Sequence, residues 1–163
     1  MQEIKSQGYS VFVGDVLEQL QTFLENHTTQ YSKFFILVDE NTHKHCLPQV
    51  LHDVHHLVDA EIIEIESGEV NKCIDVVSQV WMTLSDAEAD RKALFVNLGG
   101  GVIGDMGGFI ASTYKRGIDF LNIPTTLLSQ VDASVGGKLG IDLNGLKNQI
   151  GVFNFPQGVF VHT

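Results

Sequence analysis

Short runs of β-branched and aromatic residues alternate along this chain with stretches of helical periodicity. Lys33–Val38 and Ala93–Val96 are almost entirely apolar, which is typical of strands covered on both faces. Between such runs, apolar residues recur at three- and four-residue spacings, as at Leu17, Leu20 and Leu24. Strand and helix in alternation predict an α/β fold, a parallel sheet with helices on both faces. A chain of 163 residues is long enough for one such domain.

The pattern also places the individual elements. The expected strands are Ser10–Val13, Lys33–Val38, Ile62–Ile65, Ala93–Val96, Phe120–Ile123 and Val159–Val161. The expected helices are Pro48–Leu57, Val70–Leu84, Val102–Tyr114, Thr125–Ser134 and one that begins near Asp15. Asn144-Gly145 predicts a tight turn in a β-hairpin near residues 138–150. Ligands of such folds bind beyond the carboxyl ends of the strands, so site residues are expected just after each strand.

Charge and glycine are unevenly distributed along the chain, whose net charge is −10. Sixteen acidic and six basic residues precede Gly99, whereas the rest of the chain carries four of each. Eleven of the sixteen glycines lie between Gly99 and Gly145, where a bare backbone can approach a ligand closely. The first part therefore has the character of a scaffold and the second that of a site. The acidic balance disfavours a nucleic-acid partner.

The termini and cysteines predict a cytoplasmic protein. Residues Met1–Lys5 lack the layout of a signal peptide, and no apolar run approaches the roughly 20 residues that span a bilayer. Cys46 and Cys73 are too few for a disulfide framework and too far apart for a metal knuckle. We therefore expect a reducing compartment and no membrane partner.

The strongest local signal is the glycine-rich segment Gly99–Asp105, directly after an apolar strand. Gly99, Gly101 and Gly104 have the G-x-G-x-x-G spacing of dinucleotide sites, where backbone N–H groups and a helix N-terminus face a pyrophosphate. Tight packing of helix against strand produces the same pattern. In a standard Rossmann unit an acidic residue follows the next strand, but here Asp119 precedes it. A different nucleotide geometry is predicted, with Asp39 near the ribose or the nicotinamide.

Several polar residues downstream could bind a ligand. Thr125 and Thr126 begin a helix, and since one hydroxyl suffices for the N-cap, the pair favours a ligand contact. Asp132 is expected to be buried in an apolar helix, where it needs a cationic partner or a polar ligand. Three cations, each of which alone could be a surface residue, together suit a phosphorylated, carboxylated substrate: Arg116, Lys138 and Lys147, with Asn148 adjacent to the last. We interpret His52, His55 and His56 as a solvated helix face rather than a metal site.

The segment from Gly99 to Phe153 resembles 3-dehydroquinate synthases. It reads GGGVIGDMGGFIASTYKRGIDFLNIPTTLLSQVDASVGGKLG, followed after five residues by LKNQIGVF. Upstream, Ser67–Lys72 is similar to the family's G-E-x-x-K element, and Asp39–Asn41 to its D-x-N element. The resemblance implies that residues 1–163 are a Rossmann-like, NAD-binding N-terminal domain, and that the family's helical metal-binding domain is absent from this chain.

The resemblance also implies roles for individual residues. Asp39, Asn41, Glu69 and Lys72 would contact NAD, the last two at the adenosine end. The pyrophosphate would lie against Gly100, Gly101, Val102, Gly104 and Asp105, and Thr125 and Thr126 would also touch the cofactor. Lys138 and Lys147 would line the junction of nicotinamide and substrate together with Asp132 and Asn148, and Arg116 would reach the substrate phosphate.

The reaction implied is a carbon–oxygen lyase reaction of the shikimate pathway, in aromatic amino acid biosynthesis. It converts 3-deoxy-D-arabino-heptulosonate 7-phosphate to 3-dehydroquinate and phosphate, with NAD as a transient oxidant and Zn²⁺ or Co²⁺ as a Lewis acid. The metal's ligands would lie beyond Thr163, and none is expected among the present residues. This chain alone is therefore expected to bind NAD weakly and to be inactive, and a homodimer is implied for the full-length protein.

The hairpin departs from the family pattern K-T-G-x-N-H-P-x-G-K-N. This chain has Leu139, Asp142, Leu143 and Leu146 where the pattern has Thr, Asn, His and Gly, which leaves the choice of substrate open. Another sugar-phosphate cyclase, such as a 2-deoxy-scyllo-inosose synthase, is the nearest alternative. A metal-dependent dehydrogenase of the glycerol dehydrogenase type and a non-enzymatic nucleotide-binding module are the others.

Overall fold

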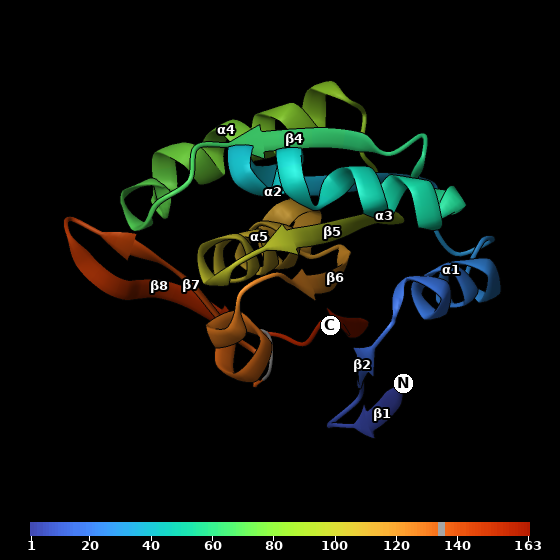
Figure 1. Ribbon diagram of the computed structural model, residues 1–163. Helices are drawn as coiled ribbons and strands as arrows, with labels where there is room; N and C mark the ends of the chain where they lie inside the picture. Colours follow the sequence, from blue (N-terminus) through green and yellow to red (C-terminus); the bar gives the residue numbers. More distant parts are fainter. Residues whose placement is uncertain (134–135) are drawn as a thin grey trace.

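The computed structural model describes residues 1–133 and 136–163 as an α/β fold (Figure 1). Within these residues, a seven-stranded sheet has the order β1-β2-β9-β6-β5-β3-β4, and β7 pairs with β8 in a separate hairpin. The strands are β1 (Gln2–Lys5), β2 (Ser10–Gly14), β3 (Lys33–Asp39), β4 (Glu61–Ile65), β5 (Ala93–Gly99), β6 (Asp119–Pro124), β7 (Lys138–Leu143), β8 (Leu146–Phe153) and β9 (Gly158–His162). The α-helices are α1 (Leu17–Asn26), α2 (Glu40–His45), α3 (Leu47–Asp53), α4 (Ile74–Asp86) and α5 (Gly101–Thr113). Shorter helical turns are η1 (His55–Leu57), η2 (Glu69–Asn71), η3 (Tyr114–Arg116) and η4 (Ser129–Ala133).

The main sheet is parallel from β2 to β4, as predicted. The exception is β1, which pairs antiparallel with β2 at the sheet edge and was not predicted. β5 lies in the middle, and all seven of its residues are buried. This agrees with the unbroken apolar run in the sequence.

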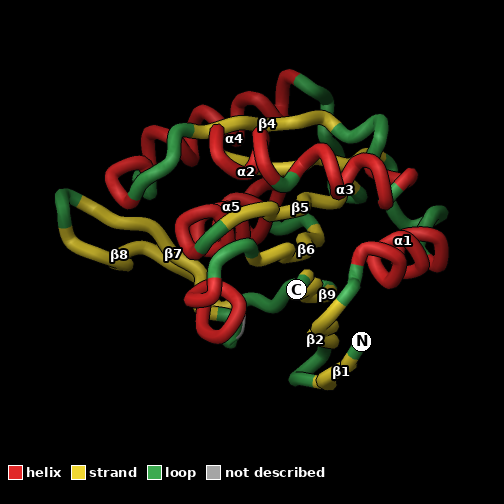
Figure 2. Tube along the Cα trace, viewed as in Figure 1, coloured by secondary structure: helices red, strands yellow, loops and turns green. Residues whose placement is uncertain are grey.

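Helices cover both faces of the sheet (Figure 2), and a hydrophobic core lies on each face. On one face, α4 and α5 bury Val80, Leu84 and Ile110 against the strands. On the other, α1 and α3 bury the leucine stripe predicted for α1 together with Val50. Alternate residues of β5 serve the two faces, Phe95 one and Val96 the other, because side chains of a strand point to opposite sides. The expected helices on both faces are confirmed.

Some helices differ from the sequence prediction. The segment Pro48–Leu57 is broken at Val54 into α3 and η1. α2 was not predicted, because its six residues show no apolar stripe. The helix expected over Thr125–Ser134 is present from Leu127 to Ala133, most of it as the π-helical turn η4, and Ser134 lies outside the described residues.

The carboxyl ends of the parallel strands gather the segments flagged by the sequence. Gly99 at the end of β5 is in register with Pro124 of β6, and Asp39 at the end of β3 is in register with Ile65 of β4. The helix α5 and the turn η2 therefore begin at this edge of the sheet, and Thr125 also lies there.

The hairpin β7–β8 projects from the body of the molecule, where its first strand packs on α5 (Figure 1). Leu139 and Ile141 of β7 belong to the core shared with α4 and α5, whereas the residues of β8 are mostly exposed. Asn144 and Gly145 at its tip have φ of 51° and 77°, as the predicted tight turn requires. The expected hairpin is confirmed, and the core contacts of β7 set its position.

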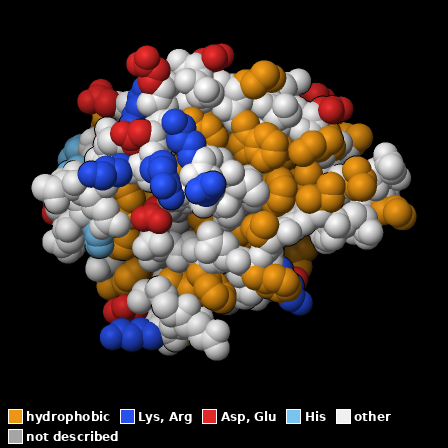
Figure 3. Space-filling view, turned by 180° about the vertical axis from the view of Figure 1, so that it is seen from behind, with side chains coloured by type: hydrophobic (Ala, Val, Ile, Leu, Met, Phe, Trp, Pro, Cys, Tyr) orange, Lys and Arg blue, Asp and Glu red, His pale blue; other side chains and the backbone are white. Residues whose placement is uncertain are grey.

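The surface seen from behind carries basic side chains gathered in one area beside a wide apolar area (Figure 3). Exposed apolar residues include Met82 of α4 and Leu146 and Phe153 of β8.

None of the helices in the described part of the chain has the length and hydropathy of a membrane span.

Candidate functional site

The turn between β5 and α5 is formed by consecutive glycines. Gly100 is the N-cap of α5, and the N–H of Gly104 donates the first helical bond to its carbonyl at 3.0 Å. A Cβ on Gly99 would lie 2.5 Å from Cγ1 of Ile103, so packing alone requires that glycine. A Cβ on Gly104 would meet nothing within 4 Å, so the first turn of α5 is open on that side. Helix N-terminal N–H groups beside open space suit an anionic group.

Thr125 and Thr126 lie beside this turn. The N–H of Thr125 donates to the carbonyl of Gly99 at 3.0 Å, and the methyl of Thr126 is the nearest neighbour of Gly100. Oγ1 of Thr126 accepts from the N–H of Ser129 at 3.2 Å, which is the capping role considered from the sequence. The two threonines therefore lie within reach of a ligand at the turn, and one of them also caps η4.

A buried lysine joins three segments next to the turn. The side chain of Lys72 is 4% exposed, and its Nζ donates to Oδ2 of Asp105 at 2.8 Å and to Oδ1 of Asn148 at 2.7 Å. Oε1 of Glu69 lies 4.0 Å from the same nitrogen. Lys72 precedes α4, Asp105 lies in α5 and Asn148 in β8, so one ammonium group connects the glycine turn's helix with the hairpin.

The carboxyl groups around Lys72 have shifted pKa values. Burial raises the pKa of Asp105, and the ion pair with Lys72 opposes part of that rise. Burial and a hydrogen bond with Asp142 raise the pKa of Glu69. Burial acts to raise the pKa of Asp142 too, but hydrogen bonds from the N–H of Asn148 and from Glu69 leave it lowered. Glu69 therefore holds a proton more readily than Asp142 does.

The two residues of the Lys72–Asn148 contact line different cavities. One, of about 450 Å³, is lined by Asp105, Asp132, Lys138 and Asn148. The other, of about 250 Å³, is lined by Glu69, Lys72, Asp142 and Lys147. Lys138 and Lys147 were expected to line one junction, but the structure places them in different cavities. Asp132 was expected to be buried, but it is exposed at the wall of the larger cavity, because η4 does not pack as a full helix.

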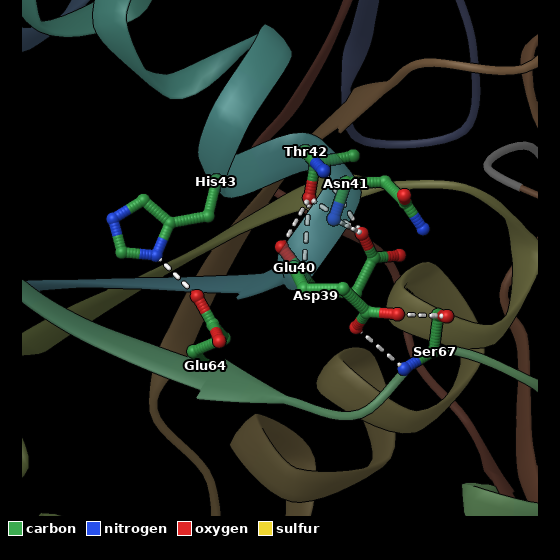
Figure 4. A network of polar contacts seen from close by, with 7 residues as sticks. All are labelled: Asp39, Glu40, Asn41, Thr42, His43, Glu64 and Ser67. Carbon is green, nitrogen blue, oxygen red and sulfur yellow. Dashed lines mark hydrogen bonds and ion pairs between the residues drawn. The ribbon is translucent and has the colours of Figure 1, made fainter.

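Asp39 and its neighbours form a polar network between α2 and the loop after β4 (Figure 4). Oδ1 of Asp39 accepts from the N–H groups of Asn41 and Thr42, both at 2.9 Å, and so caps α2. Glu40 accepts from the N–H of Ser67 at 2.9 Å and from its hydroxyl, which lowers the pKa of Glu40. Asn41 is exposed at this edge. The sequence flagged both segments but contained no signal for the Glu40–Ser67 contact.

Arg116 lies at the other end of α5 from the glycine turn. The helix has 13 residues, so its ends are about 20 Å apart. Arg116 is exposed, has φ of 69°, and lies three residues before the start of β6. Arg116 is therefore not among the residues gathered at the glycine turn.

The described residues do not form a metal centre. Among residues 1–133 and 136–163, no group of three His, Cys, Asp or Glu side chains could hold an ion. His52 is exposed and pairs with Asp53, while Nδ1 of His56 contacts Gln21 at 2.8 Å.

The fold and the glycine turn define a Rossmann-like α/β domain, and comparisons with solved structures agree. A 2-deoxy-scyllo-inosose synthase complexed with carbaglucose-6-phosphate, NAD⁺ and Co²⁺ has a TM-score of 0.87 at 23% identity, over 98% of this chain and 44% of that one. ValA, a 2-epi-5-epi-valiolone synthase from Streptomyces hygroscopicus with NAD⁺ and Zn²⁺ bound, has a TM-score of 0.78 at 24% identity, over 99% and 45%. At these identities the likeness concerns the fold.

The sequence comparisons are more specific. Residues 62–163 match the model of the 3-dehydroquinate synthase N-terminal domain, and the chain belongs to the 3-dehydroquinate synthase family. The 3-dehydroquinate synthase of Parabacteroides distasonis is 48% identical over 93% of this chain and 42% of its own length. That of Alkaliphilus oremlandii is 38% identical over 94% and 42%. The chain thus spans less than half the length of these relatives.

Proposed function

We propose that this chain is the NAD-binding part of an enzyme that converts 3-deoxy-D-arabino-heptulosonate 7-phosphate to 3-dehydroquinate and phosphate. The observation that carries the proposal is the cavity of about 450 Å³ between the second turn of α5 and the hairpin. It combines a carboxylate of α5, Asp105, with Lys138 and the amide of Asn148. Membership of the 3-dehydroquinate synthase family supports this choice of reaction.

The first turn of α5 fits the pyrophosphate of NAD. Gly100, Gly101 and Val102 present N–H groups there, and the open side of Gly104 leaves room for phosphate oxygens. Asp39 and Asn41 lie at the same edge for the ribose or nicotinamide, and Glu69 lies beside the smaller cavity for the adenosine end. Bound there, NAD would accept a hydride from the substrate and later return it. The protein would supply position and charge.

The hairpin would hold the phosphosugar. Lys138 is exposed at the wall of the larger cavity, where an ammonium group can pair with a phosphate or carboxylate. Asn148 and Asp132 line the same cavity and can hydrogen-bond the sugar hydroxyls. Lys147, on the other side of the hairpin, suits an anionic group of the cofactor better than the substrate.

We include a divalent metal in the proposal only because solved structures of similar fold contain one. Two structures of similar fold contain Co²⁺ or Zn²⁺. The described residues of this chain do not provide a ligand set, so we assign no step to a metal here. We expect the 163-residue chain to bind NAD weakly and to be inactive alone. We also propose a cytoplasmic homodimer for the full-length protein, which the exposed apolar side chains of α4 and β8 support.

The function can be tested on the natural full-length protein. Phosphate release from the heptulosonate substrate is measured with and without added NAD, after the bound cofactor has been removed. We expect NAD-dependent release, and no comparable release from glucose 6-phosphate, whose carba analogue is bound in the 2-deoxy-scyllo-inosose synthase of similar fold. Preference for glucose 6-phosphate would replace the reaction proposed here with that of the other cyclase. NAD-dependent oxidation of glycerol without phosphate release would indicate a dehydrogenase instead.

A further inference from the structure

The charged group of Lys72 is buried and paired within the chain, although the residue also lines the smaller cavity. Its side chain is 4% exposed, although a lysine is almost never buried unless it is paired. An ammonium group has three hydrogen-bond donors, and two of them are directed to Asp105 and Asn148 at 2.8 and 2.7 Å. The resemblance to the family implies a contact between this lysine and NAD, but both of these bonds are made within the chain.

The two partners of Lys72 belong to different halves of the proposed site. Asp105 lies one turn into α5, behind the glycine turn proposed for NAD. Asn148 lies on β8, in the hairpin proposed to bind the phosphosugar. β8 is held by its backbone pairing with β7 and by Ile150 and Val152, which pack against the core, while its other six residues are exposed. A charge-assisted hydrogen bond from a buried donor is therefore a strong contact at a weakly packed strand.

The backbone of Lys72 holds the other strand of the hairpin. Its carbonyl accepts from the N–H of Asp142 at 2.9 Å, and Cys73 forms an isolated bridge with the same residue. Oδ1 of Asp142 in turn accepts from the N–H of Asn148 at 2.8 Å. Asn148 has φ of 53°, so this bond and the one from Lys72 fix a residue in the left-handed region.

We propose that Lys72 is a positioning residue that holds the β7–β8 hairpin against α5 and so aligns the substrate side of the site with the cofactor side. The Lys72–Asn148 contact also joins the walls of the two cavities, since Asn148 lines the larger and Lys72 the smaller. The identity of the ligand that the hairpin binds rests on the proposed function, whereas the contact that Lys72 makes between the hairpin and α5 does not.

The first test follows amide hydrogen exchange in the ligand-free 163-residue chain. Lys72→Met keeps the aliphatic stem and removes the charge. We expect exchange at hairpin amides such as those of Asp142 and Asn148 to accelerate at least about tenfold, with β5 still protected. Unchanged exchange in the hairpin of a folded Lys72→Met variant would overturn the proposal.

A second variant covers the case in which Lys72→Met does not fold. Asn148→Gly removes the amide acceptor on the exposed strand and tolerates the positive φ. It should loosen the hairpin to a similar degree, and the double variant should add little, because both changes break one contact. Normal hairpin exchange in Asn148→Gly would contradict the link.

Lys33→Met is the matched control. Lys33 also pairs with a carboxylate, Glu61, at 2.7 Å and donates to a carbonyl, that of Ala87, at 2.9 Å. It lies at the start of β3, at the opposite edge of the sheet from the site. Removing its charge should leave the hairpin amides unchanged. Equal acceleration in this variant would mean that any lost lysine pair loosens the hairpin, which would refute the specific role of Lys72.

Kinetics of the full-length protein separate positioning from a cofactor contact. A loosened hairpin in Lys72→Met should raise KM for the phosphosugar about tenfold, with little change in kcat or in KM for NAD. A rise confined to KM for NAD would mean that Lys72 serves the cofactor instead. If the protein does not turn over the phosphosugar at all, the proposed function fails while the exchange experiment still decides the link.

Discussion

Two successive turns of α5 differ in how their glycines contact the rest of the molecule. In the first turn, a side chain on Gly104 would enter open space. One turn further along, a Cβ on Gly107 would lie 1.9 Å from Oδ1 of Asn97, and one on Gly108 would lie 2.4 Å from Leu139. The same residue type therefore leaves room for a ligand in one turn and permits close packing in the next. Sequence spacing cannot distinguish these two reasons.

The largest effect is expected in the closely packed second turn of α5. Gly107→Ala forces Asn97 to move, although Asn97 is 1% exposed and donates to Asn122 at 3.0 Å. Overpacking and a strained buried hydrogen bond should lower the free energy of unfolding by about 2–4 kcal/mol. Urea denaturation measures the change. Asn97→Ala provides the control, because Gly107→Ala should cost much less in that background. An equal cost in both backgrounds would mean that Asn97 is not the cause.

A substitution in the open first turn of α5 is expected to weaken NAD binding rather than to lower stability. Gly104→Leu fills the space beside the first turn, so NAD affinity of the full-length protein should fall at least about tenfold, with little loss of stability. Gly104→Ala is the matched control and should stabilise the chain by about 0.5–1 kcal/mol through helix propensity. Calorimetric titration measures the affinity. Undiminished binding by a folded Gly104→Leu variant would place the pyrophosphate elsewhere.

A smaller effect concerns the carboxylate behind the open turn. Burial raises the pKa of Asp105 above its ordinary 3.8, and Lys72 limits the rise. A carboxyl whose pKa is higher in the folded than in the unfolded state loses stabilising effect as pH rises through the folded pKa. Lys72→Met should raise that pKa further and so steepen the loss of unfolding free energy above about pH 3.8. Urea unfolding at a series of pH values tests this, and a shallower slope in the variant would contradict it.

Much of the scaffold could be predicted from local pattern. The apolar runs of β3 and β5 and the leucine stripe of α1 report burial directly, because periodicity and burial are the same property. The carboxyl-edge rule then placed Asp39, Glu69 and Thr125 together without any contact being known. β1 and α2 were missed because a four-residue exposed strand and a six-residue polar helix have no apolar period.

The details of the site were harder to predict from the sequence, because they depend on tertiary geometry. Asp132 was expected to be buried on the assumption of a regular helix, whereas the π-helical η4 leaves it exposed. The inward direction of Lys72 depends on where β8 passes, which no local pattern records. Arg116 was grouped with Lys138 by charge and sequence proximity, but the 13-residue helix α5 separates Arg116 from the glycine turn. A residue role carried over from a family remains a prediction until the chain's own geometry and binding are measured.

The central claim is that the open first turn of α5 hosts the pyrophosphate of NAD. An NMR titration of the 163-residue chain with NAD addresses it most directly. The account predicts saturable shifts of the amides of Gly101, Gly104 and Thr126, while Arg116 and Tyr31 at the opposite edge stay unchanged. Shifts centred on Arg116 and Tyr31, with the turn unmoved at the highest soluble NAD concentration, would contradict it.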